Sequence, residues 1–215
     1  MSREELKIEE QRGLRFEFRS FGQNFDIAAK RMARLSIPVP ESEWERKSEE
    51  VYILSRENDL SNVKIRDGKI DIKSFVKSVD GFEQWCPVMK AQFPVTDLIL
   101  RNDVFTALCV KPPELDQHIY SYNEFMTLVN LHPSLQAVSV HKQRSSYNVN
   151  NTICETATIL VNGAKILTIS SESTQIEDIK ATIEEVGLGD AENVNYVKAI
   201  KRVIGMNNQI FTNAI

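Results

Sequence analysis

Hydrophobic and polar residues alternate along three long stretches of the chain, at residues 14–21, 62–76 and 137–170. A period of two residues is the pattern of a β-strand with one buried face. The glycine or asparagine pairs Asp67-Gly68, Asn150-Asn151 and Asn162-Gly163 divide these stretches, and such pairs favour tight hairpin turns. The pattern therefore predicts antiparallel strands joined by short connections.

Including the less regular stretches at residues 50–55 and 81–93, we count seven or eight strands. The stretch at 81–93 contains Pro87, which favours an edge strand that leads into a loop. Residues 56–61 are polar and predict a turn. The predicted strands span residues 14–21, 50–55, 62–67, 69–76, 81–93, 137–149, 152–161 and 164–170.

Helical spacing of apolar residues separates and follows these strands. The predicted helices span residues 23–35, 97–108, 125–129, 174–186 and 195–205. Their expected caps are Asn24, Thr96 with Asp97, a box of Ser121 and Glu124, a box of Thr174 and Glu177, and a stop at Gly187.

Two blocks of strands separated and flanked by helices predict an α+β fold with an antiparallel sheet. We expect residues 1–12 to form a flexible or helical N-terminal arm, because they are charged and aperiodic. Residues 13–215 are expected to form a single domain with a helical insert at about 95–135.

The composition excludes several classes of protein. The apolar share of 42% and charged share of 26% are typical of a globular domain. No apolar run approaches the ~18 residues of a spanning helix, and no secretion signal is recognisable, so we expect a cytoplasmic protein without membrane contact. A net charge of −4 argues against nucleic-acid binding. The sequence does not indicate an oligomeric state.

Basic residues recur two or four positions apart in three of the strand-like stretches, as Arg15 and Arg19, Lys64 and Arg66, and Lys142 and Arg144. Each pair lies on one side of its strand. Such pairs are often only the solvated face of a half-buried sheet. If the faces instead converge, they form a cationic surface, and inside an acidic protein this surface suits a small polyanion.

Taken in order, these motifs resemble the CYTH family of triphosphate tunnel enzymes, over residues 14–204. The similar segments are Val63-Lys-Ile-Arg66, Ile70-Asp-Ile-Lys73, Lys142-Gln-Arg144 with Tyr147, Glu155, Glu172 and Asn193-Val-Asn-Tyr196. The resemblance implies an antiparallel β-barrel-like tunnel of about eight strands, flanked by helices.

The resemblance also implies roles for individual residues. The phosphate-binding candidates are Arg19, Lys64, Arg66, Lys73, Lys142 and Arg144. The candidate ligands of Mg²⁺ or Mn²⁺ are Glu17, Glu155 and Glu172, and the candidate catalytic residues are Glu17, Glu172 and Lys73. Asp71 is a further candidate ligand, although pairing with a neighbouring lysine is the more frequent role of such an acid.

Two expected acids are missing, because Arg15 and Ser170 stand where the family has glutamates. Three functions stay open. The first is metal-dependent hydrolysis of a triphosphate compound: inorganic tripolyphosphate, a nucleoside triphosphate or thiamine triphosphate. The second is a class IV adenylate cyclase, and the third is a non-catalytic module that binds polyphosphate or nucleotide. All three take a small triphosphate as partner.

Overall fold

Eight strands close into an antiparallel barrel in the computed structural model, which describes residues 14–206. The order around the barrel is β1-β10-β9-β8-β2-β3-β4-β5. The strands are β1 (Arg15–Gly22), β2 (Arg46–Ser55), β3 (Asn58–Arg66), β4 (Lys69–Val79), β5 (Phe82–Gln92), β8 (Leu135–Val149), β9 (Thr152–Val161) and β10 (Ala164–Ser173). The expected α+β fold with a barrel of about eight strands is confirmed. The N-terminal arm expected at 1–12 lies outside the described residues.

Several strands extend beyond their hydrophobic alternation. β2 already begins at Arg46, and residues 58–61, predicted as a turn, belong to β3, so that only residues 56–57 form the connection. The reason is that the barrel is held by main-chain hydrogen bonds, which exposed polar strand ends can also make. Hydrophobic alternation marks only the part of a strand with one buried face.

The two halves of β5 have different neighbours. The first half closes the barrel, since β5 pairs with β1 from Glu17↔Glu83 to Arg15↔Trp85. The second half contains Pro87 and pairs only with β4 among the described residues. The edge position predicted from this proline is therefore confirmed for that half, while the first half is interior to the sheet.

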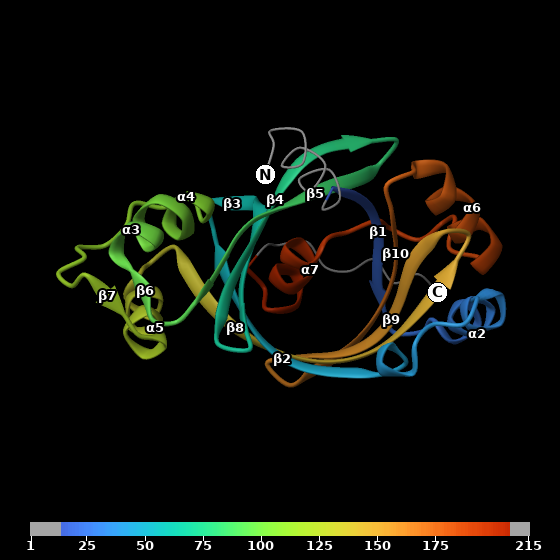
Figure 1. Ribbon diagram of the computed structural model, residues 1–215, viewed down its shortest axis with the longest axis horizontal. Coiled ribbons are helices and arrows are strands. Elements are labelled where there is room, and N and C mark those ends of the chain that lie inside the picture. The colour runs from blue at the N-terminus through green and yellow to red at the C-terminus, as the bar shows by residue number, and fades with distance from the viewer. Residues whose placement is uncertain (1–13, 207–215) are drawn as a thin grey trace.

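Helix α7 (Tyr196–Val203) lies within the ring of strands (Figure 1). Its apolar face packs with inward-facing residues of β1, β2, β8, β9 and β10, including Phe21, Leu54 and Val138. Asn195 caps the helix by accepting a hydrogen bond from the Lys198 N–H at 3.0 Å. This packing fills one end of the barrel with apolar side chains.

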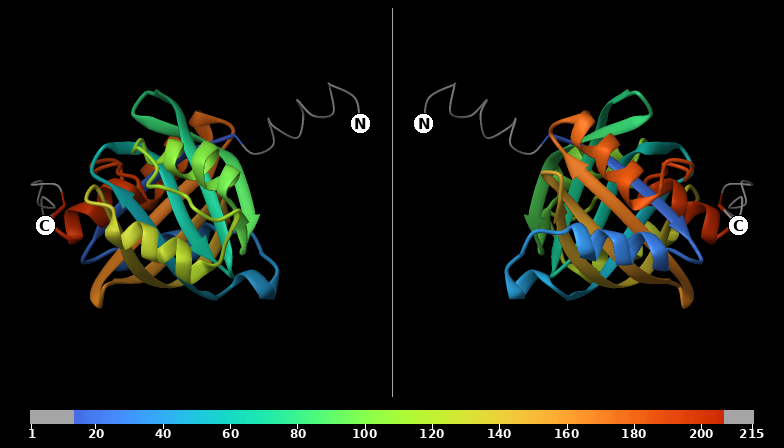
Figure 2. Two further views of the ribbon diagram at one scale, coloured as in Figure 1. Left: turned by 90° about the vertical axis from the view of Figure 1, so that its left-hand side faces the viewer. Right: turned by 90° about the vertical axis from the view of Figure 1, so that its right-hand side faces the viewer.

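Outside the barrel, α2 (Asp26–Leu35) and α6 (Ile176–Val186) cover the side opposite the helical insert (Figures 1 and 2). The expected capping box of Thr174 and Glu177 is wrong, because α6 starts later, after Gln175, whose N–H donates to the Ser173 hydroxyl. Gly187 ends α6 at a φ of 80°, as predicted. The helix predicted from residue 23 begins at Asp26, with Phe25 at the N-cap position. Asn24 therefore lies one residue before the cap, and its side-chain oxygen accepts a hydrogen bond from the Asp26 N–H.

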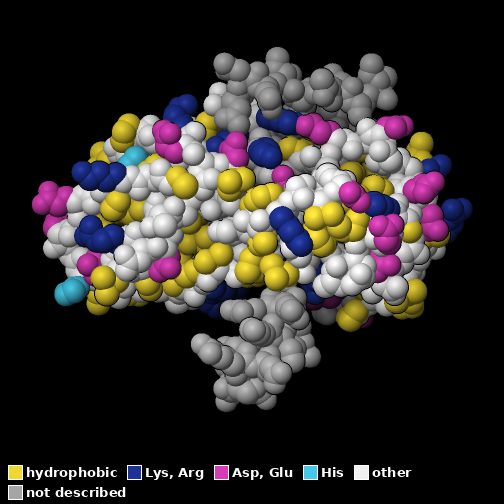
Figure 3. Space-filling view, turned by 90° about the horizontal axis from the view of Figure 1, so that it is seen from above, with side chains coloured by type: hydrophobic (Ala, Val, Ile, Leu, Met, Phe, Trp, Pro, Cys, Tyr) yellow, Lys and Arg dark blue, Asp and Glu magenta, His cyan; other side chains and the backbone are white. Residues whose placement is uncertain are grey.

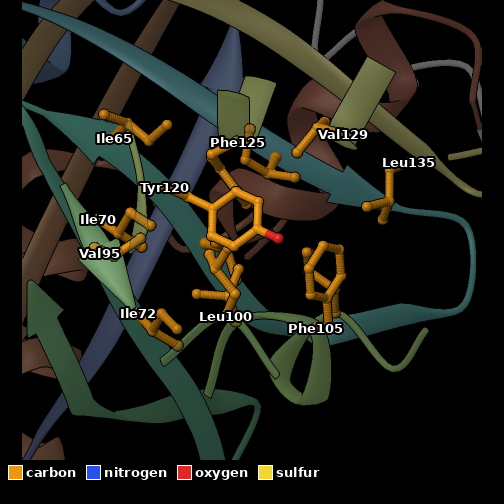
Figure 4. Close-up of a cluster of buried hydrophobic side chains, with 14 residues drawn as sticks. Ile65, Ile70, Ile72, Val95, Leu100, Phe105, Tyr120, Phe125, Val129 and Leu135 are labelled. Atoms are coloured by element: carbon orange, nitrogen blue, oxygen red, sulfur yellow. The ribbon is translucent and has the colours of Figure 1, made fainter. Parts of the chain in front are cut away.

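The insert packs on the outer face of β3 and β4 (Figure 4). It begins with strand β6 (Val95–Thr96), which is followed by the continuous helical segments α3 (Asp97–Ile99), η2 (Leu100–Val104) and α4 (Phe105–Ala107). Strand β7 (Ile119–Tyr120) pairs with β6, and helix α5 (Tyr122–Leu131) ends the insert. The capping box of Ser121 and Glu124 is present. Phe105, Phe125 and Tyr120 are buried against Ile70 and Ile72 of the barrel wall. The insert thereby stiffens the wall that carries Lys64 and Arg66.

The short 3-10 turn η1 (Glu41–Glu43) completes the described elements between α2 and β2. Within residues 14–206, no helix has the length and apolar character needed to cross a membrane.

Candidate functional site

The barrel end opposite its apolar filling contains a polar cavity of about 290 Å³. Its lining is mostly charged. The basic lining residues are Arg19, Arg46, Lys64, Arg66, Lys73, Lys142 and Arg144. The acidic ones are Glu17, Glu50, Asp71, Glu155 and Glu172. Seven cations and five acids leave this lining with a formal charge of +2 in a chain whose net charge is −4.

Strand alternation brings these residues together. Residues two apart on β1, β2, β3 and β8 point into the barrel, while the intervening residues face the helices or solvent. Along β8, for example, Val138 and Val140 fill the apolar end, and Lys142 and Arg144 continue the same face into the cavity. The N-terminal turn of α7 adds Tyr196 and Val197 as the floor.

All ten residues proposed from the sequence as phosphate-binding, metal-binding or catalytic line this one cavity. Their chemical roles stay predictions. Arg15, which was expected to join them, does not: it is exposed at the start of β1 and is absent from the lining. The expectation for Arg15 is wrong because this residue is the first of β1 and pairs with β5 but not with β10, so its side chain stays exposed.

Glu155 on β9 is surrounded by three cations. Its carboxylate lies 2.6 Å from Lys142 Nζ, 3.2 Å from Arg19 Nη1 and 3.2 Å from Arg144 Nη1. Burial raises the pKa of Glu155, but the attraction of Lys142, Arg19 and Arg144 outweighs burial and lowers it to about 2. Glu155 is therefore ionised and holds side chains from β1 and β8 in place.

Glu50 on β2 has the same function for β3. Its two carboxylate oxygens accept from Lys64 Nζ at 3.0 Å and from Arg66 Nη1 at 3.1 Å, and its side chain is 2% exposed. Burial raises its pKa, but Lys64, Lys142 and Arg66 lower it to about 2. Glu50 thus fixes two of the predicted phosphate-binding residues.

The lysines in these ion pairs, Lys64 and Lys142, also have lowered pKa values. Burial lowers the pKa of Lys64 and Lys142, and this effect and that of neighbouring cations together exceed the attraction of Glu50 and Glu155. Each carboxylate is shared among two or three cations. The deep part of the cavity is short of negative charge, which a bound polyanion would supply.

Glu17 and Glu172 differ from these two acids. They lie directly opposite each other on β1 and β10, and they share Arg19, which binds Glu17 and lies 3.9 Å from Glu172. Burial raises the pKa of Glu172, and the charge of Glu17 raises it further. Like charges directly opposite on paired strands repel each other. This acid pair is short of positive charge.

Asp71 lies 3.8 Å from Arg66 and directly opposite Lys64 on the paired strand, so it pairs with a cation, as expected, although with an arginine. Lys73 has no ion-pair partner among the described residues, and its charge acts to lower the pKa of Glu172. Lys73 is thus free to contact a ligand.

In the described part of the chain, no group of three or more His, Cys, Asp or Glu side chains is placed to hold a metal ion. Of the three predicted metal ligands, Glu155 forms ion pairs with Lys142, Arg19 and Arg144, while Glu17 and Glu172 lie opposite each other. Their role as metal ligands stays a prediction.

Sequence reasoning missed Glu50, Asn62 and Tyr196 as cavity residues. Alternation along β2 places Glu50 on the same strand face as Tyr52, but no local signal shows that Lys64 and Arg66 of β3 are its partners. Tyr196 belongs to a family-like segment, Asn193-Val-Asn-Tyr196, but no role was assigned to it because the docking of α7 into the barrel has no local signal. Tyr147, which belongs to the family-like segment after Lys142-Gln-Arg144, packs outside the barrel. On the face shown in Figure 3, basic and acidic side chains are interspersed without a large patch of one sign.

No protein-family model and no curated protein sequence matches the chain. Solved structures with a similar fold include a "putative adenylate cyclase" from Bacillus halodurans (TM-score 0.48, 9% identity, 87% of this chain and 98% of that chain). Others are the PH1012 protein of Pyrococcus horikoshii (0.46, 17%, 86% and 98%) and the Mimivirus capping enzyme triphosphatase (0.45, 10%, 87% and 98%). These are likenesses of fold, and the function is inferred from the cavity residues alone.

Proposed function

We propose that this protein is a metal-dependent hydrolase of a triphosphate compound, which binds in the cationic end of the barrel. The observation that carries this proposal is the convergence of six predicted cations, from β1, β3, β4 and β8, on one cavity that is short of negative charge. These cations lower the pKa of two carboxyl groups in the cavity, Glu50 and Glu155, to about 2.

The arginines and the lysines of the cavity would bind phosphate in different ways. Arg66 and Arg144 present planar guanidinium groups that can each bind two phosphate oxygens, while Lys64, Lys73 and Lys142 act as point charges. Because Glu50 and Glu155 already fix several of them, little side-chain ordering remains when the ligand binds. The same groups would stabilise charge on the leaving diphosphate.

Glu17 and Glu172 would hold Mg²⁺ or Mn²⁺. Magnesium is commonly bound by one or two carboxylates together with water and substrate phosphate oxygens, so this pair suffices without a third protein ligand. When bound, the ion would neutralise charge on the phosphate oxygens. Glu17 and Glu172 themselves would gain the positive charge that their opposed positions lack.

The cavity measures about 290 Å³, at the lower end of the ~300–1,000 Å³ that small-molecule sites commonly occupy. It suits inorganic tripolyphosphate, or the triphosphate part of a larger molecule whose organic part stays at the mouth.

A second candidate is a binding module without catalysis. It is favoured by the involvement of Glu155 in ion pairs with three cations, which leaves only two acids for a metal ion. Tight binding of tripolyphosphate with no release of phosphate under Mg²⁺ or Mn²⁺ would identify this second function.

Phosphate release from tripolyphosphate and from ATP, measured with Mg²⁺ or Mn²⁺ beside a cyclic-AMP assay, tests the proposal. We expect metal-dependent phosphate release, at least ~10-fold weaker in Arg144→Ala because one charge-assisted contact is lost. Arg15→Ala is the matched control, since Arg15 is exposed and outside the cavity. Equal activity of the Arg144→Ala and wild-type proteins would contradict the proposed site.

A further inference from the structure

A row of paired residues crosses the barrel wall beside the acid pair. The row runs from Glu172 on β10 to its partner Ile153 on β9, and from there to Asn148 on β8. Ile37, in the segment between α2 and β2, forms a bridge with Asn148 and ends the row. Residues directly opposite each other on antiparallel strands point to the same side of the sheet. Because Glu172 lines the cavity, the whole row faces the inside of the barrel.

The row becomes more exposed with distance from the acid pair. Glu172 is partly buried, Ile153 is 44% exposed and Ile37 is 61% exposed. Ile153, Asn148 and Ile37 do not belong to the cavity lining. These three residues therefore form a rim on the inner side of the barrel wall, between the cavity and solvent.

The two isoleucines of this rim are placed differently from other exposed apolar residues. Single exposed isoleucines are common, and Ile27 on the outer helix α2, 70% exposed, is an example in this chain. Ile153 and Ile37 instead share the inner side of the barrel and continue the row that begins at the cavity. Apolar side chains add nothing to the binding of phosphate. They fit the apolar surface of an organic group attached to the phosphates.

Asn148 adds a polar group between the two isoleucines. Its main-chain groups are paired, since its N–H donates to Ser36 Oγ at 2.9 Å and its carbonyl accepts from the Ile37 N–H at 2.9 Å. Its side-chain amide has no hydrogen-bond partner in residues 14–206 and is not one of the buried unpaired groups, so it is open to solvent. A carboxamide carries both a donor and an acceptor, and it can bind a ring edge that carries the same two groups.

The spacing of the row fits a triphosphate with an organic part. Neighbouring strands lie about 4.8 Å apart, so Ile153 lies one spacing and Asn148 two spacings, or ~10 Å, from Glu172. With the phosphates in the cavity, a linking group would pass over Ile153. A ring beyond this linking group would then reach Asn148 and Ile37.

We infer that Ile153, Asn148 and Ile37 bind the organic part of the substrate, which is a heteroaromatic ring with a hydrogen-bond donor and an acceptor on its edge. The isoleucines contact the ring and its linking group, and the Asn148 amide binds the edge. This inference rests on the proposed function and names the substrate class, a nucleoside triphosphate or thiamine triphosphate rather than inorganic tripolyphosphate.

The affinities for ATP, thiamine triphosphate and inorganic tripolyphosphate test the inference. They would be measured by titration calorimetry without divalent metal ions, so that binding is separated from hydrolysis. The variants are Ile153→Ser, Ile37→Ser and Asn148→Ala. Tripolyphosphate has no organic part and reports on the cavity alone. Ile27→Ser is the matched control, because it makes the same exchange at an exposed isoleucine outside the barrel.

For at least one of the two organic triphosphates, we expect the affinity to fall about 5- to 10-fold in each rim variant. The serine variants lose part of an apolar contact, and Asn148→Ala loses one hydrogen bond. Tripolyphosphate should bind all three rim variants as it binds the wild type, and Ile27→Ser should bind every ligand normally. Loss of affinity for ATP identifies a nucleobase site, and loss for thiamine triphosphate alone identifies a thiamine site.

Unchanged affinity of the rim variants for both organic triphosphates would overturn this inference and leave the proposed function standing. The same holds if tripolyphosphate affinity fell as much as the others, or if the wild type bound tripolyphosphate but neither organic ligand. If Ile153→Ser did not fold, Ile37→Ser and Asn148→Ala would still decide the question. A wild-type protein that bound none of the three ligands would contradict the proposed function as well.

Discussion

Two pairs of glutamates inside the same barrel have opposite electrostatic surroundings. Glu50 and Glu155 lie deep in the cavity, each between two or three cations, and their pKa values fall to about 2. Glu17 and Glu172 face each other on adjacent strands, and the pKa of Glu172 is raised by burial and by the charge of Glu17. The first pair is surrounded by positive charge, and the second is short of it.

The difference indicates what kind of ligand fits. A simple polyanion would satisfy the deep cations and leave Glu17 and Glu172 repelling each other. A metal ion alone would satisfy that acid pair and leave the cations unmatched. A triphosphate that carries a divalent metal ion presents both charges at once, so both regions of the proposed site would be neutralised together.

The largest effect is expected from removing the charge at the centre of the deep region. Glu155→Gln leaves Arg19, Lys142 and Arg144 facing one another without their shared carboxylate. Removing one partner of a buried ion pair typically costs ~3–5 kcal/mol, so the unliganded protein should unfold at a markedly lower temperature. Circular dichroism during heating measures this change.

Tripolyphosphate should restore part of the stability lost in Glu155→Gln, because its oxygens replace the missing negative charge. Glu177→Gln is the control: Glu177 forms an exposed ion pair with Lys180 at 3.1 Å, and such pairs contribute ~1 kcal/mol or less. A Glu155→Gln protein as stable as the wild type would show that the cations in the cavity need no counter-charge.

An effect of similar size for each carboxylate is expected from acid. Glu50 and Glu155 have a folded-state pKa of about 2 against an ordinary value of 4.5, so the stability that they contribute is present above pH 4.5 and is lost as the pH falls through 2. Each shift corresponds to on the order of 3 kcal/mol. Urea unfolding at several pH values between 7 and 2 measures the loss.

The same titration in Glu50→Gln should show a smaller fall between pH 4.5 and 2, since only Glu155 remains to be protonated there. An identical acid profile in this variant and the wild type would place the pKa of Glu50 near its ordinary value and would remove the contrast between the two pairs of glutamates.

The deep region was largely predictable from the sequence. Strand alternation alone decides which side of a strand faces the barrel, so the residue pattern was enough to assign Lys64 with Arg66, and Lys142 with Arg144, to common faces. Closure of the barrel then had to bring those faces together. The hairpin at Asp67-Gly68 likewise followed from local turn preferences.

Other features depend on tertiary packing and have no local signal. Glu50 was missed as a counter-ion because its partners lie on β3, a strand that reads as independent in the sequence. Tyr196 is the first residue of the short amphipathic helix α7, and the sequence of α7 does not indicate that this helix packs inside the barrel. Arg15 shares the alternation of Glu17 but is the first residue of β1, and strand ends are not marked by hydrophobic pattern.

The smallest expected change in stability comes from the acid pair. In Glu172→Gln the charge that repels Glu17 is gone, so the unliganded protein should be as stable as the wild type at neutral pH, or slightly more stable. Metal-dependent phosphate release should nevertheless fall at least ~10-fold, because one of two proposed metal ligands is lost. Thermal unfolding and phosphate release against Mg²⁺ concentration measure the two effects.

Asp71→Asn is the matched control for Glu172→Gln, since it also neutralises a cavity acid, but one that pairs with Arg66 at 3.8 Å. We expect it to shift the Mg²⁺ dependence little. If Asp71→Asn impaired metal-dependent turnover as strongly as Glu172→Gln, the metal ion would belong with the deep cations rather than with the opposed glutamates. The two regions would then not be complementary to the two charges of a metal triphosphate, and the metal ligands would have to be reassigned to Asp71 and its neighbours.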